Sequence, residues 1–205
     1  MEPYLYKSKR HNFRNEDRKQ KIIEVLSKKQ NNLKVVLEEV HDSHNLSAVL
    51  RTCDAVGVLD VDVIYRDERP LSLGKKSSSS AAKWVDVNLY NNLDEPFQKH
   101  KKLNRKILTT SLSENSVSIY EIDFTQDIVI VFGNEKDGVS KEAVEKSDGN
   151  IIIPQLGMIQ SLNISVAVAI TLFEAFRQRQ NAGLFNKINL PEEEYNNYLN
   201  NWLFK

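Results

Sequence analysis

Short runs of β-branched and apolar residues alternate along the chain with segments in which apolar residues recur every three or four positions. The first pattern is typical of buried strands, and the second is typical of amphipathic helices. The run DIVIVF is an example of the first, and Leu46, Val49 and Leu50 are an example of the second. We predict strands at residues 33–40, 61–65, 84–90, 106–111, 127–132 and 150–153.

The helical segments fall between these strands, and Gly57 stands where a C-cap would end one of them. Repeated pairing of a Val/Ile-rich strand with a helix predicts an α/β fold, in which a mostly parallel sheet is covered by helices on both faces. We predict helices at residues 15–30, 46–56, 93–103, 140–146 and 162–180, and a C-terminal helix that begins near Pro191.

Two segments need a separate explanation. Residues 66–83, which contain the sequence SLGKKSSSSAAK, are long for a connection. They are either disordered or a loop that orders on a binding partner, and we favour the binding loop.

The C-terminal helix repeats Tyr195, Tyr198 and Trp202 at helical spacing. Such a stripe can stack on nucleic-acid bases, but it is far more often packing, so we expect a docked terminal helix.

Composition narrows the class of protein. The chain has 205 residues, of which 40% are hydrophobic, enough for one substantial core. Its single cysteine, Cys53, cannot form an internal disulfide, which favours a reducing compartment. No apolar run is long enough to span a bilayer, and the first residues lack the apolar core of a signal peptide. We therefore expect a cytoplasmic protein.

The net charge is zero, but the charge is unevenly distributed. Residues 1–34 carry ten Lys and Arg against four acidic residues, a surplus of +6 that the rest of the chain balances. A basic arm on an acidic body suggests a polyanionic partner such as RNA. A solvated helix face explains the same charges equally well, so charge alone does not decide between them.

Three polar segments can carry chemistry. The first places Asn45 and Arg51 at the start of a helix, where a guanidinium would meet phosphate or carboxylate, although a lone arginine is more often a surface residue. The neighbouring His41, His44 and Cys53 lack a fourth ligand at zinc-site spacing, so we expect no metal.

The second segment, GNEKDGVS at residues 133–140, runs from a strand through a glycine-flanked turn into a helix. Glycines there allow a ligand to approach the backbone closely, although a lone turn of this kind is usually structural. It matches neither the P-loop nor G-x-G-x-x-G, and no other phosphate-binding loop follows a strand. This argues against a P-loop or Rossmann enzyme.

The third segment, residues 151–179, contains a β-branched run that stops at Pro154, a polar turn, and a long apolar helix. Ser161 and Asn163 stand where that helix begins. Backbone N–H groups and two polar side chains therefore meet at one point, which makes the turn a candidate for chemistry.

Together and in this order, the three segments resemble the SpoU/TrmH branch of the SPOUT superfamily, which comprises RNA 2′-O-ribose methyltransferases. The stretches NLSAVLRTCDAVGV and FEAFRQRQNAGL, the KWV after the Ser-rich loop and the final Trp202-Leu203 extend the resemblance over nearly the whole chain. They most resemble the members that modify guanosine 18 of tRNA.

The resemblance implies a C-terminal trefoil knot, which sequence rules alone would not suggest. It also implies that S-adenosylmethionine binds among the knot loops. The corresponding positions in this chain, most of them contributing backbone groups, are Thr110, Leu112, Gly133, Gly138, Ile153 and Leu162.

The family pattern also assigns site residues. Arg51 would act across a homodimer interface, and on physical grounds we expect it to clamp an RNA phosphate and orient the 2′-oxygen, because guanidinium is too basic to lose its proton readily. Asn45 would orient Arg51 or the ribose, and Glu135 would hold the facing loop and Asn163 by hydrogen bonds. Ser161 and Asn163 would shape the methyl-donor pocket. Methyl transfer from a sulfonium needs no metal.

The expected activity is 2′-O-methylation of a tRNA ribose, with guanosine 18 in the D-loop as the favoured position. The alternatives are another RNA site, in the anticodon loop or ribosomal RNA, and a non-catalytic RNA-binding module. We expect a basic helical extension at residues 1–32, a catalytic domain at 33–183 and a C-terminal helix at 184–205. The residues expected to bind tRNA are Lys7, Lys9, Arg10, Arg14, Arg18, Lys19, Lys75 and Lys76.

Overall fold

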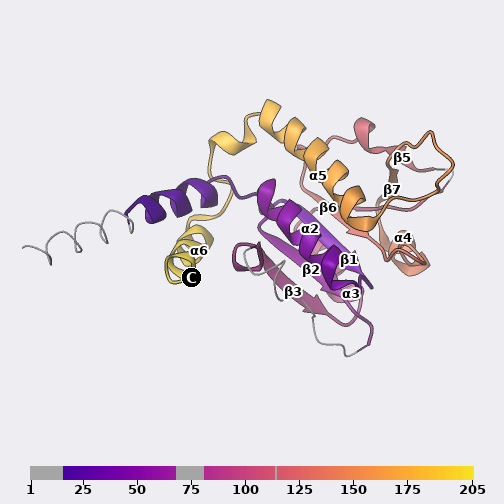
Figure 1. Ribbon diagram of the computed structural model, residues 1–205, viewed down its shortest axis with the longest axis horizontal. Helices are drawn as coiled ribbons and strands as arrows, with labels where there is room; N and C mark the ends of the chain where they lie inside the picture. Colours follow the sequence, from indigo (N-terminus) through magenta and orange to yellow (C-terminus); the bar gives the residue numbers. More distant parts are fainter. Residues whose placement is uncertain (1–15, 68–80, 114) are drawn as a thin grey trace, which may run out of the picture.

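The computed structural model describes residues 16–67, 81–113 and 115–205 (Figure 1). Several predictions lie outside these ranges: the first residues of the basic arm, the middle of the loop at 66–83, and the tRNA-binding candidates Lys7, Lys9, Arg10, Arg14, Lys75 and Lys76. Arg18 and Lys19 are described, and both are exposed on a helix that covers residues 16–26.

Seven strands form one sheet in the order β3-β2-β1-β6-β4-β7-β5, and every pair of neighbours is parallel. The predicted parallel sheet is therefore confirmed. Every residue of the central strands β1 and β6 is buried, which explains their continuous apolar sequences. The strands are β1 (Leu33–Glu38), β2 (Asp60–Ile64), β3 (Asp86–Tyr90), β4 (Lys106–Thr109), β5 (Val117–Ser118), β6 (Ile128–Phe132) and β7 (Gly149–Ile152).

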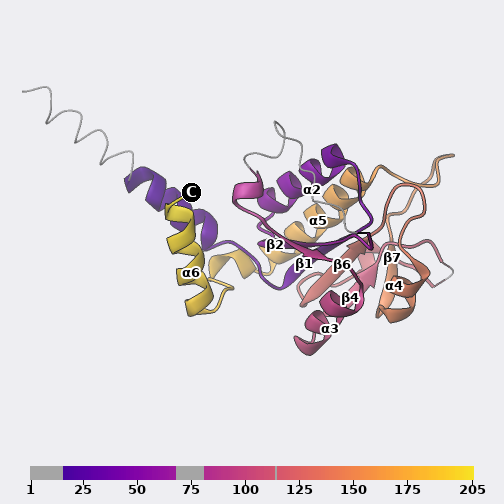
Figure 2. The ribbon, with the colours of Figure 1, turned by 90° about the horizontal axis from the view of Figure 1, so that it is seen from below.

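Helices cover both faces of the sheet, as predicted. Figure 2 shows α2 (Ser43–Ala55) and α5 (Ile164–Asn181) on one face, and α3 (Asp94–Lys102) and α4 (Lys141–Lys146) on the other. The larger apolar cluster lies under α2 and α5, and a smaller one lies under α3 and α4. Within the described ranges, none of the helices has the length and apolar character that crossing a membrane requires.

The order of the strands decides where their following loops meet. β6 lies between β1 and β4, and β7 lies on the other side of β4. The carboxyl ends of β6, β4 and β7 are therefore adjacent at one edge, although the three strands are separated in the sequence. In open parallel sheets, ligands bind outside the carboxyl ends of the strands.

The structure corrects several predicted boundaries. α2 begins at Ser43, three residues before the predicted start, because the Asp42 carboxylate accepts a hydrogen bond from the backbone N–H of His44 at 2.8 Å. α5 begins at Ile164, and its N-cap is Asn163 alone. The short strand β5 was not predicted, since two residues carry no periodic pattern. Gly57, with φ of 86°, follows α2 as expected.

The two ends of the described chain pack against each other. The helix at 16–26 and α6 (Glu192–Leu203) share an apolar cluster that includes Leu26, Leu59 and Trp202. Trp202 is 1% exposed and meets Trp84 edge-to-face, with ring centroids 5.0 Å apart. The prediction that the C-terminal aromatic stripe is packing is confirmed for Trp202.

A buried polar network lies beneath α3. His100 Nε2 is 2.7 Å from Asp62 Oδ2, and the Asn88 amide donates to Asp62 at 2.9 Å. Arg105 NH1 is 3.2 Å from His100 Nδ1. Because a guanidinium can only donate, His100 must be neutral with its proton on Nε2. Burial lowers the pKa of His100, in agreement with this tautomer.

This network predicts a loss of stability in mild acid. Since the folded-state pKa of His100 lies below the unfolded value, the unfolded chain binds a proton more readily as the pH falls below about 6.5. The free energy of unfolding should therefore fall between pH 7 and pH 5. Urea titrations across this range should show that the free energy of unfolding depends less on pH in His100→Gln than in the wild type. An equal pH dependence would contradict the assignment of His100 as a neutral, buried group.

Candidate functional site

The glycine-flanked turn after β6 is held together by hydrogen bonds among its own residues. Asn134 Oδ1 accepts hydrogen bonds from the N–H groups of Lys136 and Asp137, at 2.9 and 2.7 Å. A Cβ on Gly133 would lie 1.9 Å from the backbone carbon of Gly138, and Gly138 has φ of 68°. The turn therefore requires both glycines. It leaves the side chain of Glu135 exposed.

We expect Gly133→Ala to open this turn, because backbone would have to move to admit the methyl group. Amide hydrogen exchange in residues 133–140 should become faster, and the melting temperature should fall. Gly157→Ala is a matched control, since a Cβ there meets nothing within 4 Å. Equal amide exchange in the Gly133→Ala variant and the wild type would show that the turn does not depend on the close approach of Gly133 to the backbone of Gly138.

Three of the predicted site residues form one hydrogen-bonded chain. The Asn45 amide donates to Glu135 Oε1, and Asn163 Nδ2 donates to Asn45 Oδ1 at 3.1 Å. Asn163 Oδ1 in turn accepts from the backbone N–H of Ser165 at 2.9 Å and so caps α5. The start of α2, the glycine turn and the start of α5 therefore meet at these side chains. Glu135 is linked to Asn163 through Asn45, rather than by the direct hydrogen bond that was predicted.

Arg51 does not join this chain. It follows Asn45 by six residues on α2, about 240° around a helix, so the two side chains leave on different faces. Arg51 is exposed, and no hydrogen bond joins it to Asn45 or to any other described residue. Ser161 is also exposed, two residues before the N-cap, and has no hydrogen bond within the described ranges. Asn45 therefore does not orient Arg51 within this chain, and the alternative, that Asn45 orients the ribose, stays a prediction.

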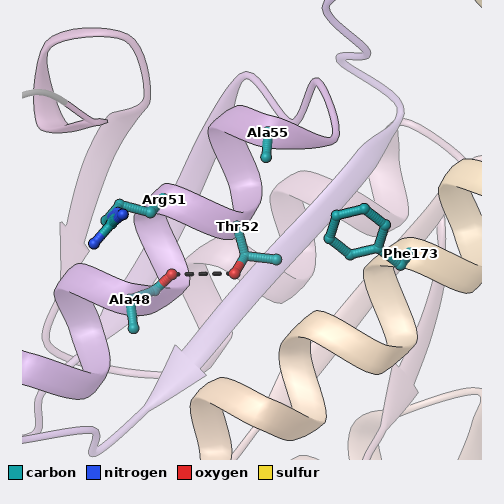
Figure 3. Close-up of a pocket in the computed structure, with 5 residues that line it drawn as sticks. All are labelled: Ala48, Arg51, Thr52, Ala55 and Phe173. Carbon is teal, nitrogen blue, oxygen red and sulfur yellow. Dashed lines mark hydrogen bonds between the residues drawn. The ribbon is translucent and has the colours of Figure 1, made fainter.

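Arg51 instead lines an open pocket of about 310 Å³ between α2 and α5 (Figure 3). Its guanidinium extends away from Phe173, which is 52% exposed on α5. Phe173 is not among the predicted site residues, although alanines at helical spacing around an arginine could have indicated a hollow there. The other lining residues, on the same face of α2, are Ala48, Thr52 and Ala55.

The six predicted cofactor positions lie in loops at the carboxyl edge of the sheet. Thr110, Gly133 and Ile153 directly follow the adjacent strands β4, β6 and β7. Thr110 is tied to the β6 strand, because its N–H and hydroxyl both donate to Val131 O at 3.0 Å. The other three positions are Leu112, which is exposed, Gly138 in the glycine turn, and Leu162 just before α5.

These loops expose apolar side chains to an unusual degree. Leu156 and Met158 are fully exposed, Leu112 is 80% exposed and Ile159 is 63% exposed. Exposed apolar surface is a feature of interaction sites, so these side chains make the loops candidates for ligand contact. The edge where the backbone groups of β4, β6 and β7 converge therefore also carries exposed apolar loops.

Residues 32–173 match the SpoU rRNA Methylase family, and this range contains the whole Glu135–Asn45–Asn163 chain, the glycine turn and the Arg51 pocket. The chain belongs to this family. The family resemblance stated from the sequence is confirmed. Over 192 residues the chain is 44% identical to the tRNA (guanosine(18)-2′-O)-methyltransferase of Thermus thermophilus, in an alignment that covers 94% of this chain and 98% of the relative.

Solved structures agree with this SpoU membership. The TrmH/SpoU tRNA modifying enzyme of A. aeolicus superimposes with a TM-score of 0.87 at 39% identity, over 93% of this chain and 96% of that one. An AdoMet-bound rRNA methyltransferase from Sinorhizobium meliloti superimposes with a TM-score of 0.58 at 25% identity, over 75% of this chain and 59% of that one.

The residues considered as metal ligands have other surroundings in this SpoU chain. His41 stacks on Tyr65, and burial raises the pKa of the Cys53 thiol to about 12, so the thiol is protonated and poorly suited to ligation. Within the described ranges, His, Cys, Asp and Glu side chains do not gather in groups of three or more that could hold a metal ion.

Proposed function

We propose that this SpoU-family chain methylates the 2′-hydroxyl of a tRNA ribose, at guanosine 18, with S-adenosylmethionine as the methyl donor. The observation that carries the proposal is the Glu135–Asn45–Asn163 chain, which joins the three family segments at the carboxyl edge of the sheet. The position in tRNA rests on the relative that is 44% identical over nearly the whole of both chains.

The carboxyl edge fits this donor. S-adenosylmethionine supplies a methyl group already activated on a sulfonium. The backbone of Leu112, Gly133, Ile153 and Leu162 would hold it, beside Thr110 and Gly138. The apolar loops suit a purine ring, and the exposed Glu135 carboxylate suits a cationic ligand better than a phosphate. A donor that needs no Lewis acid is consistent with a site built from amides, a carboxylate and backbone groups.

The protein must then align the ribose hydroxyl and assist the loss of its proton. Arg51 binds an RNA phosphate through its fork of N–H donors and orients the 2′-oxygen. Since guanidinium does not readily give up its proton, the phosphate that Arg51 holds assists the removal of the hydroxyl proton. Asn45 is held by Glu135 and Asn163, so that it meets the ribose with a fixed amide, and Ser161 and Asn163 shape the donor pocket.

We propose that the active form is a homodimer in which Arg51 completes the site of the partner copy. Arg51 and Asn45 leave α2 on different faces, so Arg51 is poorly placed to serve the chain of side chains in its own subunit. Val166 and Phe173 on α5 are 45% and 52% exposed, and they offer apolar surface beside the Arg51 pocket. A trefoil knot through the loops after β4, β6 and β7 belongs to the same proposal, and the non-sequential strand order supports it.

The tRNA is bound mainly by the basic extension at residues 1–32 and by the loop at 66–83, which is part of the catalytic domain at 33–183. The helix at 184–205 supports the extension, because α6 packs against the helix at 16–26. The reaction takes place in the cytoplasm, where tRNA is matured.

Deletion of residues 1–21 should weaken tRNA binding while leaving S-adenosylmethionine binding intact, because the deletion removes basic residues and none of those at the carboxyl edge. Filter binding at several salt concentrations should show a lower affinity and a smaller salt dependence. Arg18→Ala combined with Lys19→Ala should reproduce part of the loss. Unchanged tRNA affinity of the truncated protein at moderate salt would remove the arm from the proposed interface.

The function itself is tested by incubating the protein with labelled S-adenosylmethionine and total tRNA, and by mapping the alkali-resistant dinucleotide. A 2′-O-methylated guanosine at position 18 of the D-loop is the expected product. A site in the anticodon loop would overturn the proposed specificity, and so would transfer to ribosomal RNA in a parallel reaction. Absence of transfer to any RNA would favour a non-catalytic RNA-binding module.

A further inference from the structure

A buried carboxylate stands at the end of the central strand β1. Glu38 is 1% exposed, and each of its two oxygens has a partner. Oε1 accepts from Arg66 NH2 at 2.8 Å, and Oε2 accepts from the backbone N–H of Ser140 at 2.9 Å. The carboxylate therefore joins the end of β1 to Arg66, two residues after β2, and to the start of α4.

Arg66 is held at this junction by its backbone as well as its side chain. Its N–H donates to Glu39 Oε1 at 2.8 Å, and its NH2 group also lies 3.2 Å from Ser140 Oγ and 3.4 Å from Glu142 Oε2. Arg66 is the cation that faces the buried oxygen of Glu38. A buried carboxylate that loses its counter-charge is strongly destabilised.

The junction fixes the far end of the glycine turn. Ser140 comes two residues after Gly138, and its hydroxyl accepts from the N–H of Ala143 at 3.1 Å and caps α4. Glu38 thus fixes the turn that presents Glu135, and Glu38 also lies four residues before the N-cap of α2, the helix that carries Asn45. Both partners of the Glu135–Asn45 hydrogen bond belong to segments that adjoin Glu38.

We propose that Arg66 is a positioning residue for methyl transfer, which balances the buried charge of Glu38 and thereby holds Ser140 and the turn at 133–138 in the arrangement that binds S-adenosylmethionine. The proposal rests on the function proposed above. Arg66 does not touch the reacting atoms. It acts through Glu38, Ser140 and the turn.

The first test compares two variants that each remove a cation bonded to Glu142. Arg66→Met should weaken S-adenosylmethionine binding about tenfold in calorimetry and raise its KM by a similar factor, with a much smaller change in kcat. Lys146→Met is the matched control, because Lys146 also bonds Glu142, at 2.6 Å, and its side chain is 35% exposed against 44% for Arg66. It should bind the donor as the wild type does.

Two further variants separate positioning from a general loss of packing. Arg66→Lys, which keeps the charge, should recover most of the donor affinity. Glu38→Gln introduced into the Arg66→Met variant should also recover affinity, because it removes the unbalanced charge and leaves an oxygen for the Ser140 N–H. Amide exchange in residues 133–140 of the donor-free protein should rise in Arg66→Met and return toward the wild-type rate in both of these variants.

The outcomes distinguish this inference from the proposed function. Equal donor affinity and equal exchange in Arg66→Met and Lys146→Met would overturn the positioning role, as would additive losses for Glu38→Gln and Arg66→Met. If the wild type methylates no tRNA but binds the donor, the substrate assignment fails, whereas the affinities still decide the role of Arg66. If the wild type does not bind the donor, the proposed function is wrong. The role of Arg66 is then tested by amide exchange alone, and an unchanged exchange rate in Arg66→Met would show that Arg66 does not hold the turn at 133–138.

Discussion

Arg51→Ala is expected to lower kcat/KM for tRNA methylation by about 10²–10³-fold, the usual effect of removing one preorganised donor from a transition state. S-adenosylmethionine affinity should stay near the wild-type value, because Arg51 lies on a different face of α2 from the Glu135–Asn45–Asn163 chain. The kcat/KM of Arg51→Lys should lie between those of the wild type and Arg51→Ala, since an ammonium keeps the charge but loses the fork of donors. Single-turnover assays and calorimetry measure the two effects separately.

Mixing inactive proteins tests whether Arg51 serves the partner copy. A heterodimer of Arg51→Ala with a variant unable to bind the donor, such as Gly133→Ala, would contain one site in which both defects are absent. Activity should therefore reappear when the two proteins are mixed and refolded together. Near-normal methylation by Arg51→Ala alone would end its catalytic role, and an active species that sediments only as a monomer would end the dimer proposal.

Arg179→Met is expected to have the largest effect on stability. The Arg179 side chain is fully buried near the end of α5 and donates to Phe124 O, Gln126 O and Asn32 O, and to the side-chain oxygens of Asn32 and Gln30. Methionine would leave these buried acceptors without a donor, at about 1–3 kcal/mol for each one that water cannot reach. We expect a loss of at least about 4 kcal/mol, which is a large part of the stability of a typical domain.

Thermal unfolding should therefore shift downward by about 10 °C or more in Arg179→Met. Arg177→Met is the matched control on the same helix, because Arg177 is exposed and pairs with Glu174 within one turn. Its melting temperature should fall much less, since Glu174 keeps a hydrogen bond from the Gln178 amide. Equal melting temperatures for the two variants would show that the carbonyl groups around Arg179 find other partners.

The sequence predicted the sheet correctly because both faces of a parallel sheet are covered. A strand such as β6 then reads as a short unbroken apolar run, IVIVF, whose β-branched and aromatic residues favour a strand over a buried helix. The short strand β5 was not predicted because its two residues, Val117 and Ser118, are half-exposed at the sheet edge and do not form an apolar run. Helix starts were misplaced by two or three residues, where Asp42 and Asn163 act as caps ahead of the apolar stripe.

The site was predictable by residue type but only partly by contact. Family resemblance named Asn45, Glu135 and Asn163, and the structure joins them. It could not show that Asn163 divides its amide between capping α5 and binding Asn45, because that depends on how three distant segments meet. The Glu38–Arg66 contact also escaped prediction, since charged residues at the ends of strands usually face solvent.

The packing of the two chain ends has a consequence for synthesis. Trp202 closes the apolar cluster beneath the helix at 16–26, and Lys29 is buried between Asp54 and the Trp202 ring. The helix at 16–26 leaves the ribosome long before α6, against which it packs. A nascent chain can therefore form its sheet before this helix has a fixed position, and the proposed contact of its basic residues with tRNA has to wait for α6.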